Sequence, residues 1–222
     1  MSARLIVIEG LDGAGKHTQT EIATSKLAAM GFSVSYVSFP DYDNPASAGV
    51  KMYLSGELGE LSEVSAYAAS LLYAVDRYTS FRAKWQKAIK NSDFVLCDRS
   101  TTSNITHQMS KLPRAQWDEF LNWLYDIEFG RLALPKPDLV LYLDTSPEVS
   151  RRLIYSRAGG DTTQIDIHEK NYEYMLKCRT SALYAAEHLG WQVVSCVSGD
   201  SMRDKLDIAE ELMSYIAAAF GI

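Results

Sequence analysis

The sequence has 222 residues, of which 47% are hydrophobic and 23% charged, and its formal net charge is −6. This composition excludes a largely disordered chain, and the length favours a single domain, 1–222, because one core serves chains of up to about 250–300 residues. The acidic balance argues against a protein that coats nucleic acid, which would carry a basic excess.

The cysteines and the apolar runs indicate where the protein works. Cys97, Cys178 and Cys196 are widely spaced, which is typical of neither a disulfide framework nor a zinc site. Cys97 and Cys196 lie in apolar runs, so we expect their thiols to be buried. Glu9 and Asp12 interrupt the first apolar run, which argues against a signal peptide, and no run reaches the roughly 18 residues of a membrane span. We therefore expect a cytoplasmic protein with no membrane partner.

Short runs rich in valine, isoleucine and leucine alternate with helical patterns along the chain. The predicted strands are 4–8, 33–38, 94–97, 139–143 and 192–197. The predicted helices are about 16–31, 64–90, 114–129, 147–155, 167–189 and 201–220. This alternation predicts an α/β fold: a parallel sheet of about five strands with helices on both faces and ligands at the carboxyl ends of the strands.

A phosphate-binding loop follows the first predicted strand. Its residues are Gly10-Leu11-Asp12-Gly13-Ala14-Gly15-Lys16-His17-Thr18, with the spacing Gly-x-x-x-x-Gly-Lys. Glycines let successive backbone N–H groups face phosphate oxygens, the following helix directs its positive end there, and Lys16 adds a full charge. His17 stands where a hydroxyl normally binds magnesium, so the pattern supports phosphate more than metal. The alternative is a chance match in a glycine-rich turn.

Two further strands end in candidate site residues. Phe39-Pro40 follows the second strand, and Asp98-Arg99 follows the third. An acid beside a phosphate loop can hold a magnesium-bound water, and an arginine offers a bidentate fork to a phosphate. The alternative is that Asp98 and Arg99 pair with each other and cap the next helix.

Tyr73 and Arg77 lie four residues apart on one helical pattern and so share a face. A ring and a guanidinium on one face suit a nucleotide base, because the ring can stack and the arginine can donate to a carbonyl. The alternative is a core tyrosine with a solvated arginine.

Together these elements resemble the thymidylate kinase family of P-loop nucleoside-monophosphate kinases. The matching motifs, in the family's order, are Gly10–Lys16, Phe39-Pro40, Asp76-Arg77, Asp98-Arg99 and Leu134-Pro135-Lys136-Pro137-Asp138. The segment Ile127-Glu128-Phe129-Gly130-Arg131-Leu132 is similar to that of actinobacterial members. The resemblance implies a P-loop NTPase fold with a short mobile lid at about 156–168, and a homodimer.

The resemblance also implies a role for each matching residue. Residues 10–18 would hold the phosphates of ATP, and Asp12 would lie near the acceptor sugar and magnesium. The remaining implied contacts are with the acceptor nucleotide: Phe39, Pro40 and Tyr42 as its lining, Tyr73 stacked on the base, Arg77 on its 4-carbonyl, Arg99 on its phosphate, Ser103 in the acceptor site, Asn104 at the base edge, and Tyr172 beneath the deoxyribose.

Members of the family place a catalytic arginine either in the phosphate loop or in the lid. Gly13 occupies the loop position here, so the chain resembles the lid type, with Arg157 as the candidate. The catalytic set is then Lys16, Arg99, Asp12 and Arg157, with Asp12 and Asp98 toward magnesium.

We therefore expect ATP-dependent phosphorylation of thymidine monophosphate (dTMP) to the diphosphate. The first alternative is a deoxynucleoside kinase, which needs a carboxylate base near a 5′-hydroxyl; Asp41 keeps it open. The second is a GTPase-like switch, which the absence of an Asn-Lys-x-Asp motif disfavours.

Overall fold

The computed structural model describes residues 3–157, 159 and 171–222. The predicted lid, about 156–168, therefore lies almost entirely outside the described residues, as does the side chain of Arg157.

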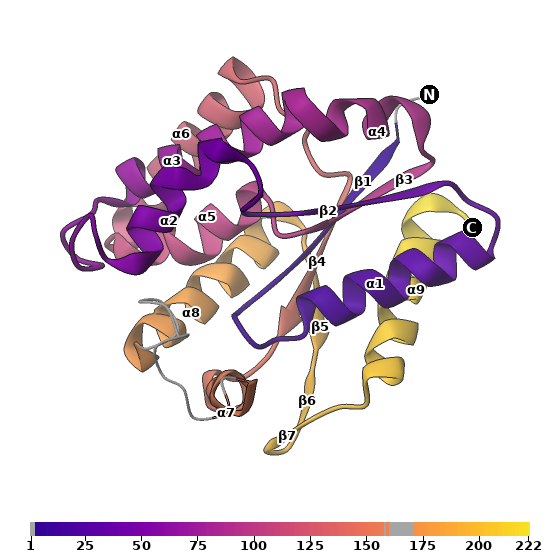
Figure 1. Ribbon diagram of the computed structural model, residues 1–222. Helices are drawn as coiled ribbons and strands as arrows, with labels where there is room; N and C mark the ends of the chain where they lie inside the picture. Colours follow the sequence, from indigo (N-terminus) through magenta and orange to yellow (C-terminus); the bar gives the residue numbers. More distant parts are fainter. Residues whose placement is uncertain (1–2, 158, 160–170) are drawn as a thin grey trace.

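Within the described residues, five parallel strands form the central sheet (Figure 1). Their bounds are β1 Arg4–Gly10, β2 Val34–Ser38, β3 Phe94–Asp98, β4 Leu139–Asp144 and β5 Gln192–Ser195. The order is β2-β3-β1-β4-β5, with Ile8 of β1 opposite Asp98 of β3 and Leu141 of β4. The predicted parallel sheet is confirmed, and the loops after β1 and β3 leave from neighbouring strands at the same edge.

The remaining elements of the described chain connect these strands. Their bounds are α1 Lys16–Ala29, η1 Pro45–Ser47, α2 Ala48–Ser55, α3 Ala66–Ser80, η2 Phe81–Trp85, α4 Gln86–Asn91, α5 Thr101–His107, η3 Met109–Lys111, η4 Arg114–Gln116, α6 Trp117–Tyr125, η5 Asp126–Arg131, α7 Pro147–Arg157, α8 Tyr172–Leu189, β6 Val197–Ser198, β7 Ser201–Met202 and α9 Lys205–Phe220.

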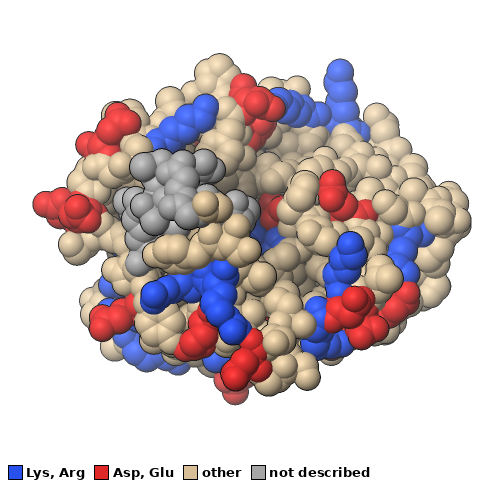
Figure 2. Space-filling view, turned by 60° about the horizontal axis from the view of Figure 1, so that its bottom comes forward, with Lys and Arg blue, Asp and Glu red and all other residues tan. Residues whose placement is uncertain are grey.

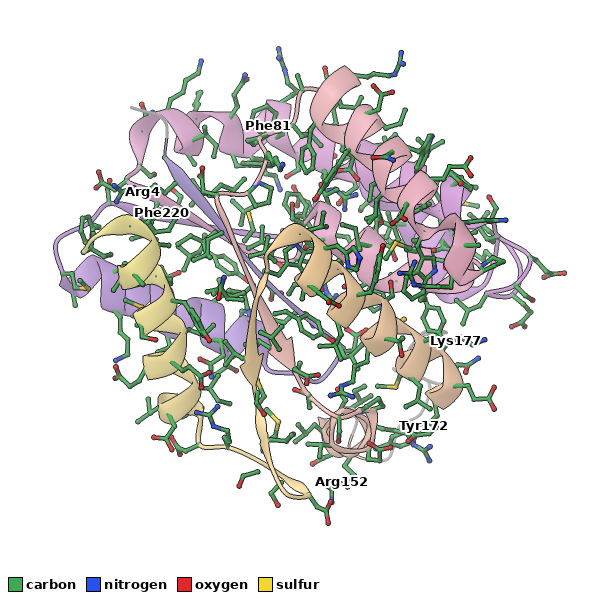
Figure 3. All side chains as sticks on the ribbon, turned by 180° about the vertical axis from the view of Figure 1, so that it is seen from behind. Arg4, Phe81, Arg152, Tyr172, Lys177 and Phe220 are labelled. Carbon is green, nitrogen blue, oxygen red and sulfur yellow. The ribbon has the colours of Figure 1, made fainter. Side chains whose placement is uncertain are left out.

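Apolar side chains cover the sheet on both faces, as the uninterrupted Val/Ile/Leu runs predict. Ile6 and Ile8 pack in the cluster of α1 and α9, which includes Leu27 and Leu212. Leu5 and Val7 face the opposite cluster, to which α3, α5, α6 and α8 contribute (Figure 1). The two ends of the chain meet as well, since the Arg4 guanidinium lies 5.0 Å from the ring centroid of Phe220 (Figure 3).

Several helix boundaries differ from the predictions. The predicted helix 64–90 is three elements, because a wider π-helical turn, η2, separates α3 from α4. The last helix begins at Lys205 rather than 201, because residues 197–202 form the hairpin β6–β7. Helices α2 and α5 were not predicted. Helix α5 has the sequence TTSNITH, whose β-branched and hydroxyl residues have low helix propensity, and it forms because the sheet and α8 bury it.

The three cysteines are free and buried, as predicted for Cys97 and Cys196. Burial raises the pKa of Cys178 and of Cys196 to about 12. Both thiols therefore stay protonated and unreactive near neutral pH.

The described surface carries mixed charge. Lysine and arginine lie interspersed with aspartate and glutamate on the face that Figure 2 turns forward, rather than forming one broad basic area. No helix among the described residues combines the length and apolar character that crossing a membrane requires.

Candidate active site

The phosphate loop connects β1 to α1 at the centre of the sheet edge. Gly13 and Gly15 have φ angles of +77° and +86°, which side-chain-bearing residues rarely adopt. Ala14 N donates to Leu11 O at 3.1 Å, which closes a turn inside the loop. The loop thus reaches the N-terminus of α1, where backbone N–H groups and the helix dipole attract anions.

Gly13 is also required for space. A Cβ at this position would lie 2.7 Å from the backbone oxygen of Ser150 on α7. The Ser150 hydroxyl donates to the carbonyl oxygen of Asp12, so α7 contacts the loop at Gly13 and at the residue before it. No side chain fits here, which agrees with the sequence-based inference that an additional arginine comes from outside the loop.

Lys16 lies at the first position of α1 and is 7% exposed. Its Nζ donates to Leu11 O at 2.8 Å and lies 4.0 Å from Asp12 Oδ1. Burial and the nearby Arg99 charge lower the pKa of Lys16, against the opposing effect of Asp12, Asp98 and Glu9. The charge of Lys16 is therefore poorly solvated within the protein, and an incoming phosphate would be a favourable partner.

His17 and Thr18 are exposed on α1. His17 Nδ1 lies 3.1 Å from the Tyr36 hydroxyl, and its Nε2 lies 3.4 Å from Glu21. The His17 ring thus contacts β2 and the next turn of α1. This position of the loop pattern is usually a serine or threonine, and His17 has no hydroxyl to offer there.

Arg99 is the second cation of the site. It follows β3 in the left-handed region, with φ +68°, a strained conformation for a residue with a side chain. Its Nη2 donates to Asp12 Oδ1, and its Nη1 lies 3.3 Å from His107 Nε2 and 3.4 Å from Ser103 Oγ. Burial alone would lower the pKa of Arg99, but the carboxylates of Asp12, Glu9 and Asp98 raise it, so Arg99 stays charged.

Glu9 is a site residue that the sequence analysis missed. It lies in β1, one residue before the end of the strand, with no solvent exposure, and accepts from the hydroxyls of Thr102 and Ser103, each at 2.7 Å. One of its carboxylate oxygens lies 3.5 Å from Arg99 Nη1. Glu9 thus joins the start of α5 to Arg99. An acidic residue inside a buried strand was the signal that could have identified it.

A small acceptor-side cavity of about 70 Å³ lies between the phosphate loop, α3 and α5. It is lined by Asp12, Pro40, Tyr42, Leu54, Tyr73, Arg99, Ser103, Asn104, His107 and Gln108. The structure therefore brings seven of the residues predicted for the acceptor site together, from four separate segments of the chain. Leu54 and Gln108 were not predicted.

Three predicted contacts are not supported by this arrangement. Phe39 is buried in the core, where its ring centroid lies 5.9 Å from that of Trp85. Arg77 is 2% exposed and binds Glu128, because that buried carboxylate receives the guanidinium fork. Tyr172 begins α8 and donates to Glu148 on α7, so it lines a different cavity.

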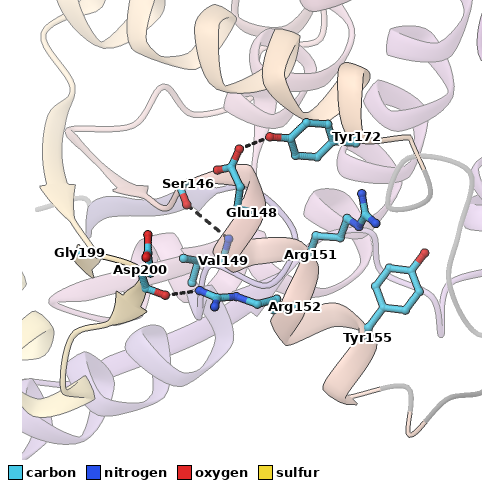
Figure 4. Close-up of a pocket in the computed structure, with 9 residues that line it drawn as sticks. All are labelled: Ser146, Glu148, Val149, Arg151, Arg152, Tyr155, Tyr172, Gly199 and Asp200. Atoms are coloured by element: carbon cyan, nitrogen blue, oxygen red, sulfur yellow. Dashed lines mark hydrogen bonds between the residues drawn. The ribbon is translucent and has the colours of Figure 1, made fainter.

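This second cavity, of about 780 Å³, lies between α7 and the β6–β7 turn (Figure 4). Arg152 donates to the Asp200 carbonyl oxygen. The Cζ atom of Arg151 lies 5.7 Å from the ring centroid of Tyr172. Arg152 and Tyr172 are at the same end of the molecule (Figure 3). The hydroxyl of Ser150, on the same helix α7, donates to the Asp12 carbonyl oxygen and so connects this helix to the phosphate loop.

The candidate metal residues are Asp12 and Asp98. Among the described residues, no group of three or more His, Cys, Asp or Glu side chains is arranged to hold a metal ion. Two carboxylates beside a phosphate loop nevertheless fit magnesium, which commonly binds one or two carboxylates together with substrate phosphates and waters. Asp98 is 8% exposed, and both carboxylates act on the charge of Lys16.

A parallel sheet with a glycine-rich loop opening into α1, a buried lysine and a second cation define an α/β protein of the P-loop NTPase class. The solved structure of a thymidylate kinase from Candida albicans has the same fold, with a TM-score of 0.72 over 98% of this chain and 92% of that one, at 23% identity.

Sequence comparison gives the family. The thymidylate kinase family model matches residues 8–203. A thymidylate kinase of Mycobacterium tuberculosis is 36% identical over 183 residues, covering 82% of this chain and 84% of that protein. One from Pelotomaculum thermopropionicum is 28% identical over 215 residues, covering 96% and 95%. This chain therefore belongs to the thymidylate kinase family and is a kinase, as the sequence motifs indicated.

Proposed function

We propose that the protein transfers the γ-phosphoryl group of ATP to the phosphate of dTMP, giving thymidine diphosphate. The observation that carries this proposal is Arg99, a half-buried guanidinium that lines the acceptor cavity and lies one strand away from the phosphate loop. The acceptor is already an anion and needs no strong general base. Catalysis is then positioning of two phosphates and neutralisation of their charge by Lys16 and Arg99.

The acceptor cavity must enlarge to hold a nucleotide, because ligand pockets commonly measure roughly 300–1,000 Å³. Tyr42 is 49% exposed and lies in the loop after β2, so its movement would open the cavity at little cost. A phosphate would compete with Asp12 for Arg99. The Tyr73 ring lines the cavity and offers the base a surface for stacking.

The donor nucleotide would bind along the phosphate loop toward the cavity of α7. Its phosphates would meet the N-terminus of α1, with Arg151 and Arg152 on the adenine side. Arg157 remains the candidate for the lid arginine, since Gly13 leaves no room for a side chain in the loop. Closure of a lid would exclude water and suppress hydrolysis of ATP.

Magnesium is the cofactor that we propose, with Asp12 and Asp98 as the residues that would hold it through its waters. When bound there, the metal would supply positive charge to the donor phosphates. Lys16 and Arg99 supply the remaining positive charge from the protein itself.

The alternative of a deoxynucleoside kinase depends on a free carboxylate near the acceptor. Asp41 does not fill this role well, because its Oδ1 accepts from Lys84 Nζ at 2.7 Å and its backbone N donates to Asp76. An acceptor panel with magnesium-ATP tests the choice: dTMP should give the highest kcat/KM, and thymidine should give no turnover. Faster turnover of thymidine or of a purine monophosphate would contradict the proposal.

We also propose a homodimer formed through α3. Leu71, Val75 and Tyr78 are 44%, 53% and 38% exposed and lie on one face of the helix, since they are spaced four and three residues apart. Sedimentation analysis should give a dimer for the natural protein and a monomer for Val75→Glu. Leu206→Glu, at a similarly exposed position on α9, is the matched control and should stay dimeric. A dimeric Val75→Glu variant would exclude this face.

The free cysteines indicate the cellular compartment in which the protein works. Three reduced thiols are ordinary for the cytoplasm and unusual for secreted proteins, so we propose that the enzyme works there.

A further inference from the structure

A fully buried carboxylate lies behind the acceptor cavity and is not used by the proposed reaction. Glu128, in the π-helical turn η5, has no solvent exposure. It accepts from Arg77 Nε at 2.8 Å and from Arg77 Nη2, from Thr101 Oγ1 at 2.7 Å, and from Asn104 Nδ2 at 3.1 Å. One carboxylate thus collects donors from α3 and from two positions of α5.

The position of Glu128 is unusual for a charge. The apolar face of α6 runs through Trp117, Phe120, Leu121 and Leu124, and the next turn on that face brings Glu128 to the core. A buried ion pair contributes little net stability compared with apolar residues of similar size. The consequence of this cluster is therefore expected in the orientation of its partners rather than in the free energy of unfolding.

The partner that reaches the acceptor cavity is Asn104. Its Nδ2 donates to Glu128 and also to the backbone oxygen of Ser70, at 3.3 Å. Both partners are acceptors only, so the nitrogen must face them and the amide cannot be turned round. Asn104 lines the cavity, and its carbonyl oxygen is then the amide atom presented to a base.

We propose that Glu128 is a positioning residue that selects the base of the acceptor nucleotide through Asn104. A carbonyl oxygen at the base edge accepts from a ring N–H, which thymine and uracil carry at N3. Cytosine has an acceptor at the same atom, so two acceptors would face each other. Glu128 thus favours N3–H pyrimidines over cytosine. This inference rests on the proposed function.

The test compares kcat/KM for dTMP with kcat/KM for deoxycytidine monophosphate (dCMP). Glu128→Gln keeps the shape of the side chain but replaces an acceptor oxygen with a donor NH₂. Asn104 Nδ2 then loses its acceptor on η5 and is held inward only by the longer bond to the Ser70 backbone oxygen. The dTMP/dCMP ratio should fall tenfold or more, since an unpaired buried polar contact costs that much. In the Asn104→Ala background, the same substitution should change the ratio no further.

Thr101→Val is the matched control, because it removes another donor to the same carboxylate and leaves Asn104 held. It should lower thermal stability and leave the ratio unchanged. Glu128→Asp keeps the charge with a shorter reach, so its ratio should lie between those of the natural protein and Glu128→Gln. If Glu128→Gln does not fold, the dTMP/dCMP ratio of Glu128→Asp tests the inference in its place.

An unchanged ratio in a folded Glu128 variant, an equal change in Thr101→Val, or additive effects with Asn104→Ala would overturn the inference. Absence of dTMP phosphorylation by the natural protein would instead overturn the proposed function, so the two failures are distinguishable.

Discussion

The Arg99→Ala variant is expected to lose roughly 30- to 5,000-fold in kcat/KM for dTMP, because truncating one partner of a hydrogen-bonded charge pair costs roughly 2–5 kcal/mol. The substitution would leave the acceptor phosphate unpaired and Asp12 without its guanidinium partner. Arg99→Lys should recover only part of the loss, since an ammonium group cannot reproduce the bidentate fork. Steady-state kinetics and calorimetric binding of dTMP measure both effects.

The control for this substitution is Arg131→Ala. Arg131 is 71% exposed and forms a surface pair with Asp126, and such pairs contribute about 0–1 kcal/mol. Its kinetics should match those of the natural protein. Turnover of Arg99→Ala near the natural rate would remove Arg99 from the reaction.

The Gly13→Ala variant should be destabilised and should bind ATP poorly. The left-handed φ alone costs roughly 1–2 kcal/mol for alanine, and the contact of 2.7 Å with Ser150 adds to it, because neither backbone segment can move independently. Denaturant unfolding gives the loss of stability, and KM for ATP gives the effect on the loop.

Gly190→Ala separates strain from steric overlap. Gly190 has a similar φ of +72°, and a Cβ there would meet no atom within 4 Å. This variant should lose only the strain energy and keep the natural KM for ATP. Equal behaviour of the two variants would show that contact with α7 does not constrain the loop.

Much of the fold was predictable from local patterns. Apolar runs and the helices between them gave the five parallel strands, since a strand buried on both faces needs an uninterrupted run. Helix α5 was missed because its propensity is low and its stability comes from tertiary burial. The break in the helix 64–90 was missed because a π-helical turn preserves the helical hydrophobic pattern on both sides.

The site was predictable only where residues are neighbours in the sequence. The phosphate loop and the Asp98-Arg99 pair are local motifs, and the structure brings them together as expected. Arg77 and Glu128 are 51 residues apart, and no local pattern indicates that one holds the other. The role predicted for Tyr172 came from the resemblance, and the partner that Tyr172 contacts, Glu148, comes into reach only because α7 packs beside α8.

The pairing of Arg99 with Asp12 has a consequence for the energetics of substrate capture. Two cations, Lys16 and Arg99, lie among three carboxylates, those of Glu9, Asp12 and Asp98. If Arg99 binds the acceptor phosphate as proposed, that phosphate would replace the carboxylate of Asp12 at the guanidinium, in an exchange of one anion for another. The affinity for the phosphate would then reflect the difference in free energy between two ion pairs. It should therefore vary less with ionic strength than the cationic residues alone would imply.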